Sequence, residues 1–91
     1  MTQARGTFEV LNKLGLHARA ATKLVQLASQ FSCDIQISRA GQSANAKSVM
    51  GVLLLCGSKG SLLEVEARGP EADEAVRRIG QLIGGRFGED E

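Results

Sequence analysis

The chain contains no tryptophan or tyrosine, and among its 91 residues only three phenylalanines, one proline and one histidine. Proteins that bind single-stranded nucleic acid commonly stack the bases on aromatic rings, and this chain has very few such rings. The formal net charge is only +1, so no overall attraction to nucleic acid or to an anionic membrane is expected. These scarcities argue against a nucleic-acid-binding protein.

Cysteine is equally scarce, and the two residues present, Cys33 and Cys56, have no metal-binding spacing. The first residues do not resemble a signal peptide, so we expect a cytoplasmic protein with two free, packed thiols. The longest apolar run, 49–56, is far shorter than the ~20 residues that cross a bilayer, and no membrane insertion is expected. We expect one domain over residues 1–91, without metal or cofactor.

Apolar and polar residues alternate in segments 7–10, 34–38 and 63–67, which predicts half-buried strands. A weaker strand over 42–46 follows the turn signal Ala40-Gly41, so 34–46 is predicted to be a hairpin. Each confident strand has one apolar and one polar face. A sheet that is solvated on one face is typically antiparallel.

Three segments have helical character. Apolar residues recur three and four apart from Ala18 to Phe31, predicting an amphipathic helix. The run 49–56 fits a buried strand or a short helix, and we favour a helix because Ser48 is a good N-cap and Gly57 a good stop. The last helix is predicted from Gly69-Pro70 to Gly84-Gly85, with Pro70 in its first turn and Gly80 weakening it.

The predicted element order is therefore βαββαβα, an α+β fold. Because the sheet offers one apolar face, all three helices must cover that face, giving an open-faced two-layer β-sandwich. The acidic C-terminal residues 88–91 are expected to be frayed.

The only histidine, His17, lies where the strand-and-loop pattern changes to the helical one, two residues before Arg19. The first N–H groups of a helix have no intrahelical partner, so a helix start attracts anions such as phosphate. Its polarity also disfavours a protonated ring. Arg19 offers a fork that matches phosphate oxygens, and segment 13–23 contains no acidic residue. His17 is thus either an ordinary cap or loop residue, or a nucleophile in an anion site that carries phosphate transiently.

Two motifs at their mutual spacing resemble the HPr family, the histidine phosphocarriers of the bacterial phosphoenolpyruvate-dependent phosphotransferase system. They are Gly15-Leu16-His17-Ala18-Arg19 and Lys47-Ser48-Val49-Met50-Gly51-Val52, supported by Ala21 and Lys59-Gly60. The resemblance implies a four-stranded antiparallel sheet in the order 1-4-2-3 under three helices. It implies a carrier, not an enzyme, that accepts a phosphoryl group from enzyme I on Nδ1 of His17 and passes it to an enzyme IIA-type protein. Arg19 would stabilise the phosphate.

The resemblance also implies a partner surface at Ala18, Lys23, Lys47, Val49, Met50 and Leu53, and we expect a monomer. Ser48 is expected to cap its helix, and it resembles the serine that HPr kinase/phosphorylase modifies in many family members. The chain departs from the family in one respect, because Ala20 stands where proline usually follows the arginine. Ala20 is expected to leave the first helical turn looser.

The sequence admits three other interpretations. Segment 57–60 fits the GXXG loop of KH RNA-binding domains, but that loop joins two helices and here a strand pattern follows it. A purely regulatory docking protein of this family can lack the histidine, which this chain retains. The segment 85–91, with Phe87 followed by acidic residues, slightly resembles a carrier of the nitrogen-related branch, which signals without moving sugar. The motif Lys47-Ser48-Val49-Met50-Gly51 resembles the sugar-related HPr instead, so both interpretations stay open.

Overall fold

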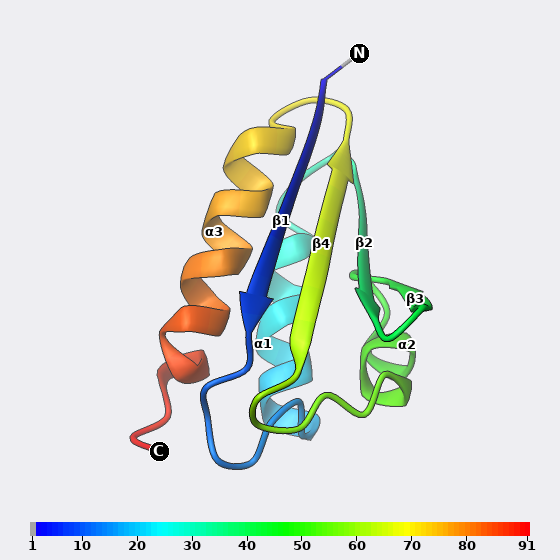
Figure 1. The fold of residues 1–91 in the computed structure, drawn as a ribbon. Coiled ribbons are helices and arrows are strands. Elements are labelled where there is room, and N and C mark those ends of the chain that lie inside the picture. Colours follow the sequence, from blue (N-terminus) through cyan, green and yellow to red (C-terminus); the bar gives the residue numbers. More distant parts are fainter. Residues whose placement is uncertain (1) are drawn as a thin grey trace.

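A four-stranded antiparallel sheet carries all three helices on one of its faces (Figure 1). The structure is a computed structural model that describes residues 2–91. Its elements are β1 (Gln3–Glu9), α1 (Ala18–Ala28), β2 (Asp34–Arg39), β3 (Gln42–Asn45), α2 (Val49–Leu54), β4 (Leu62–Arg68), α3 (Ala72–Gly84) and a 3-10 turn, η1 (Arg86–Gly88). The predicted α+β sandwich is confirmed.

The sheet has the order β1-β4-β2-β3, and every neighbouring pair is antiparallel. Phe8 of β1 lies opposite Leu63 of β4, and Val65 lies opposite Ile37 of β2. Directly opposed residues share a face, so this register puts the apolar positions of three strands on the helix side. The predicted strand order is confirmed.

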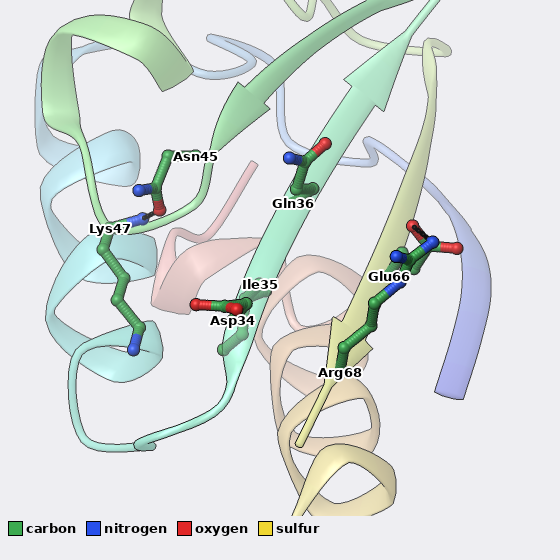
Figure 2. Close-up of a pocket in the computed structure, with 7 residues that line it drawn as sticks. All are labelled: Asp34, Ile35, Gln36, Asn45, Lys47, Glu66 and Arg68. Carbon is green, nitrogen blue, oxygen red and sulfur yellow. Dashed lines mark hydrogen bonds and ion pairs between the residues drawn. The ribbon is translucent and has the colours of Figure 1, made fainter. Parts of the chain in front are cut away.

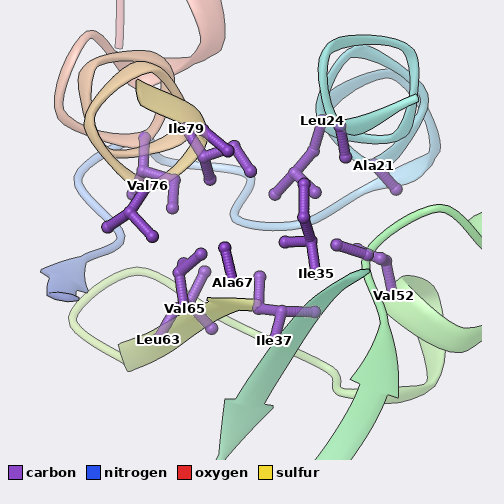
Figure 3. Packing of buried hydrophobic residues seen from close by; sticks show 14 of the residues in the cluster. Ala21, Leu24, Ile35, Ile37, Val52, Leu63, Val65, Ala67, Val76 and Ile79 are labelled. Atoms are coloured by element: carbon purple, nitrogen blue, oxygen red, sulfur yellow. The ribbon is translucent and has the colours of Figure 1, made fainter. Parts of the chain in front are cut away.

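The core lies between the sheet and the helices (Figure 3). Leu24 from α1 and Ile79 from α3 point towards the apolar side chains of β2 and β4, and Val52 closes the layer from α2. α3 packs on β1 and β4, and α1 packs between α2 and α3. The first turn of α1 lies at one end of the sandwich (Figure 1). Within residues 2–91, no helix has both the length and the apolarity required to span a bilayer.

Gly80, which the sequence pattern treats as a weak point of the last helix, has a packing role. A Cβ at this position would lie 2.3 Å from the ring of Phe8. Glycine is therefore required for α3 to approach β1 closely enough to cover that ring. The cost in helix propensity is offset by this contact.

Two predicted helix boundaries are wrong. α3 begins at Ala72, after the N-cap Glu71 in the left-handed region at φ 62°, so Pro70 precedes the helix instead of forming its first turn. α2 ends at Leu54, two residues before the predicted end of the run at Cys56, and Cys56, not Gly57, has a positive φ (54°) after it. Cys56 is also exposed, whereas Cys33 is buried, so only one of the two thiols is packed as predicted.

Candidate functional site

His17 is the N-cap of α1, in the extended region at φ −74° and ψ 177°. Its Nδ1 accepts the backbone N–H of Arg19 at 3.3 Å, and its carbonyl accepts the N–H of Ala21 at 2.9 Å. The helix therefore begins where the change of periodicity predicted it to begin. The imidazole is about a quarter exposed, so one of its edges faces solvent.

The loop before His17 is fixed by a close contact with the loop after α2. The N–H of Leu16 donates to the carbonyl of Gly57 at 2.7 Å, and the Leu16 side chain is buried in the core. Gly15 has φ 65°, and a Cβ there would lie 2.4 Å from the Gly57 oxygen. Glycine is the residue that permits both this conformation and this approach, and so it sets the place of His17.

The second ring nitrogen of His17 meets an acid from the far end of the chain. Nε2 contacts the Oε2 atom of Glu89, while Glu89 Oε1 accepts the Asn12 amide at 3.0 Å. The hydrogen bond from His17, followed by the one from Asn12, holds the pKa of Glu89 below its usual range. Since a carboxylate only accepts, these partners assign the hydrogen to Nε2 and the lone pair to Nδ1.

Asn12 is fully buried between the loop and the tail. Its amide also donates to the carbonyl of Gly15 at 2.8 Å. Its Oδ1 has no hydrogen-bond partner among residues 2–91, which is costly for a buried acceptor. Asn12 thus joins the loop before α1 to the carboxylate that contacts His17.

The tail that was expected to fray makes specific contacts in the structure. Phe87 is completely buried, the N–H of Lys13 donates to the Glu91 carbonyl at 2.9 Å, and Arg86 donates to the Asp90 carbonyl at 2.8 Å. The chain's C-terminus therefore lies at the same end of the molecule as the start of α1 (Figure 1). Segment 13–23 contains no acidic residue, but the tail brings the carboxylate of Glu89, which is distant in the sequence, against His17.

An open hollow surrounds the exposed edge of the imidazole. It is lined by Lys13, Leu14, His17, Arg19, Glu89, Asp90 and Glu91. Arg19 is exposed, and its backbone N–H is hydrogen-bonded to the imidazole of His17. Within the described chain, no hydrogen bond or ion pair holds its guanidinium. A guanidinium in this state is free to bind an incoming oxyanion. Ala20, at the usual proline position, is fully buried in the first turn.

α2 packs beside α1, and Ser48 caps it as predicted. The Ser48 hydroxyl oxygen accepts the N–H of Gly51 at 3.1 Å. Met50 and Leu54 are 69% and 70% exposed, whereas Val49 and Leu53 are half-buried. Part of this helix is therefore exposed, and the exposed part includes Leu54, which the family resemblance does not assign to the partner surface.

The remaining predicted partner residues have different surroundings. Ala18 is exposed beside His17. Lys23 donates to the carbonyl of Phe87 at 2.7 Å, and Lys47 donates to the carbonyl of Phe31 at 2.6 Å. Both ammonium groups therefore tie backbone segments together. Leu14, which the pattern also missed, is 67% exposed and lines the His17 hollow.

A second hollow lies on the polar face of the sheet, lined by Asp34, Ile35, Gln36, Asn45, Lys47, Glu66 and Arg68 (Figure 2). It lies where β2 begins and β4 ends, at the opposite end of the molecule from the start of α1 (Figure 1). Charges of both signs line it, including Arg68 and Glu66 at 3.7 Å. Nothing in it favours one class of ligand. No group of three or more His, Cys, Asp or Glu in the described part of the chain is placed to hold a metal ion.

The fold and the solvent-facing histidine at a helix start define a class of small histidine-containing phosphocarrier proteins. The family model described as PTS HPr component phosphorylation site matches residues 4–84. The chain belongs to the HPr family of the phosphotransferase system, and its general role is that of a phosphocarrier.

Two curated relatives and one solved structure illustrate the similarity. The phosphocarrier protein HPr of Cupriavidus necator is 48% identical over 82 residues, covering 90% of this chain and 92% of that protein. The phosphocarrier protein NPr of Shewanella violacea is 42% identical over 89 residues, covering 98% of each. The crystal structure of HPr-C-His from Thermoanaerobacter tengcongensis has a TM-score of 0.90 at 40% identity and covers 100% of both chains.

Proposed function

We propose that His17 is the phosphoryl acceptor, receiving the group from enzyme I on Nδ1 and passing it to an enzyme IIA-type protein. The observation that carries this proposal is the ring geometry. The lone pair of Nδ1 lies at the N-terminus of α1, where it accepts the N–H of Arg19, and at the edge of an open hollow. The exchange is proposed to occur in the cytoplasm, with the carrier acting as a monomer.

The proposed transfer is a nucleophilic displacement at phosphorus. The Nδ1 lone pair forms the new N–P bond while the bond from phosphorus to the donor breaks, and its electron pair leaves with the donor. No general base is needed, because the attacking lone pair carries no proton. The hydrogen bond that it accepts from the Arg19 N–H, at 3.3 Å, must break as the N–P bond forms. Passing the group on repeats the same steps with this chain as the donor. A labile N–P bond suits a carrier that must release the group to its next partner.

Arg19 and the first turn of α1 are proposed to hold the phosphoryl oxygens. The N–H groups of this turn have no helical acceptor, and the Arg19 guanidinium is unengaged within residues 2–91. Both bind the oxygens without competing for the phosphorus atom. They therefore stabilise the phosphorylated ring and the transfer state, while the reacting nitrogen stays accessible.

The proposed docking surface runs from the start of α1 to α2, which packs beside α1. It consists of Ala18, Val49, Met50 and Leu53, with Lys23 and Lys47 at its rim, and the structure supports adding Leu14 and Leu54. An exposed apolar patch beside a reactive group is typical of a protein-binding surface. Partners that enclose His17 would also exclude water from the transfer.

Ser48 is proposed to be a regulatory phosphorylation site for HPr kinase/phosphorylase. Its hydroxyl is half-buried and engaged as a cap, so modification must break the bond to Gly51. A phosphate there would put negative charge beside the apolar side chains Val49 and Met50. It would therefore weaken partners that dock on an uncharged surface.

A second candidate is a regulatory carrier of the nitrogen-related branch, which signals without transporting sugar. The similarity to the NPr protein of Shewanella violacea, over 98% of this chain, favours it. The two candidates share the chemistry at His17 and differ in partners. Steady-state transfer rates with sugar-type and nitrogen-type enzyme I and enzyme IIA proteins separate them, because the cognate pair gives the higher kcat/KM.

The test of the shared chemistry is one reaction. The protein is mixed with enzyme I, magnesium and phosphoenolpyruvate, and its intact mass is measured. We expect one added phosphoryl group that is acid-labile and absent from His17→Ala, while Ser48→Ala is labelled like the wild type. An unmodified mass, under conditions that fully label a known HPr, would exclude the carrier role. With ATP and HPr kinase, an acid-stable phosphate is expected on the wild type and not on Ser48→Ala.

A further inference from the structure

The last residues of the chain are held against the His17 loop by contacts on both sides of Glu89. Before it, Phe87 is completely buried and its carbonyl accepts the Lys23 ammonium at 2.7 Å. After it, the carbonyl of Glu91 accepts the backbone N–H of Lys13 at 2.9 Å. Contacts on both sides restrict the positions that the Glu89 side chain can reach. The Glu89 side chain is only 13% exposed, although it lies near the C-terminus.

The two oxygens of Glu89 have separate partners. Oε1 accepts the amide of the buried Asn12 at 3.0 Å, and Oε2 contacts Nε2 of His17. The same Asn12 amide donates to the Gly15 carbonyl at 2.8 Å, so the carboxylate is oriented by the loop that carries the histidine. Asn12, Glu89 and His17 thus form a hydrogen-bonded series that ends at the ring nitrogen opposite the reacting one.

A carboxylate at Nε2 has two chemical consequences. It fixes the ring in the orientation and tautomer that leave the lone pair on Nδ1, at the start of α1. It also balances the positive charge that the ring acquires when Nδ1 bonds to phosphorus while Nε2 keeps its hydrogen. In other histidine sites a carboxylate on the second nitrogen orients the ring and raises the basicity of the first.

We propose that Glu89, held by Asn12, is a positioning residue for phosphoryl acceptance by His17, so that the acidic tail is a working part of the site. This inference rests on the proposed function and adds residues that the sequence motif around His17 does not contain. During transfer, the N–P bond forms on Nδ1, the donor keeps the electron pair of the broken bond, and the hydrogen remains on Nε2 against Glu89.

The first test needs no phosphoryl donor. Nitrogen-15 NMR of the unphosphorylated protein reports which ring nitrogen carries the hydrogen and how fast it exchanges with water. We expect an observable, downfield Nε2 proton in the wild type that is lost in Glu89→Ala and weakened in Asn12→Ala. Glu89→Gln keeps an acceptor oxygen without charge, so its proton is expected to remain, shifted upfield. A wild-type ring without a hydrogen-bonded Nε2 proton would overturn the proposal.

The second test is steady-state transfer from phosphorylated enzyme I. Loss of a carboxylate that orients a reacting histidine typically costs about 10–100-fold, so kcat of Glu89→Ala is expected to fall about tenfold. KM should change little, because Glu89 lies outside the proposed apolar docking surface. Glu89→Gln is expected to be intermediate. Transfer at the wild-type rate, or faster transfer that would mark the tail as an obstruction, would overturn the proposal.

Asp73→Asn is the matched control. It removes one negative charge from the exposed first turn of α3, and Asp73 is not among the residues that line the His17 hollow. We expect wild-type kinetics and an unchanged Nε2 proton. A loss of kcat equal to that of Glu89→Ala would assign the effect to net charge and overturn the proposal. If the wild type itself is not phosphorylated, the proposed function fails, while the NMR test still decides how Glu89 holds the ring.

Discussion

The helices α1 and α2 both begin at a residue whose side chain accepts a backbone N–H, yet the two sites have different surroundings. Around His17 lie charged side chains of both signs, among them Lys13, Arg19 and Glu89. Ser48 precedes the apolar residues Val49 and Met50, and it lines a hollow with uncharged residues, among them Asn45 and Leu54. The first site suits a charged group that arrives and leaves. The second site suits contact with another protein.

The caps themselves also differ. An imidazole has two nitrogens, so His17 caps α1 with Nδ1 and is held through Nε2 by Glu89, 72 residues away in the sequence. The Ser48 hydroxyl oxygen is occupied by the N–H of Gly51, and its helix has only six residues. In the proposed mechanism, the start of α1 becomes a reactive site because a distant segment completes it, and a cap alone does not suffice.

Gly15→Ala should produce the largest loss of stability, because it removes the glycine that supports the α1 site and leaves the α2 site intact. A left-handed conformation and a Cβ placed 2.4 Å from the Gly57 oxygen together should cost about 3 kcal/mol of unfolding free energy. Chemical denaturation measures this cost. The corresponding change at the α2 site, Gly51→Ala, meets Ala44 at 3.2 Å and gains helix propensity, so it should stay within ~1 kcal/mol of wild type. Equal costs would show that the two helix starts are equally constrained.

Arg19→Ala should act on transfer and not on folding. A hydrogen bond to a charged group contributes about 1.5–3 kcal/mol, so transfer from enzyme I should slow about 10–100-fold. The melting temperature should stay near the wild-type value, because the guanidinium holds nothing within residues 2–91. Arg68→Ala, at the opposite end of the sheet, is the control and should transfer normally. A melted Arg19→Ala protein would make this residue structural.

Ser48→Ala should show the reverse pattern. Loss of a serine cap costs about 1 kcal/mol, which lowers the melting temperature of a domain this size by roughly 4–8 °C. Phosphorylation of His17 should proceed at the wild-type rate. Calorimetry and the labelling assay measure the two properties on one sample. A strong loss of labelling would mean that the α2 cap also shapes the reacting site.

The local features of both sites were predictable because short-range patterns encode them. The change from alternating to helical periodicity located His17, and a serine before an apolar run located the α2 cap. The residues alone also gave a sheet covered on one face. The order of its strands came from the family resemblance, since pairing between β1 and β4 has no local signal.

The missed features depend on contacts between distant segments. Gly80 looks like a weakness in a helix until the ring of Phe8 is placed against it. Phe87 follows two glycines and has a positive φ of 53°, so nothing in its neighbourhood predicts a fully buried ring. Burial of Phe87 in turn brings Glu89 to His17. The only signal in the sequence was the opposite charge of the tail and the segment around Lys13 and Arg19.

The smallest expected effect is the pH dependence of the tail contact. Hydrogen bonds from His17 and then Asn12 hold the pKa of Glu89 below its usual range, and below its value in the unfolded chain, about 4.3. A group with a lowered folded pKa contributes stability above the unfolded pKa and loses it as pH falls through the folded one. The stability difference between wild type and Glu89→Gln should therefore be constant near neutral pH and shrink on acidification.

Denaturant unfolding of both proteins over a pH series measures this difference, and Glu74→Gln supplies a comparison. The pKa of Glu74 is also lowered, by its hydrogen bond to Arg77, but both side chains lie exposed on α3. Added salt should weaken the Glu74 contribution, because exposed pairs are screened. The contact of Glu89 with His17 is largely shielded from solvent and should be less sensitive to salt. Equal sensitivity would place Glu89 in solvent, and the α1 site would then be as local as the α2 site.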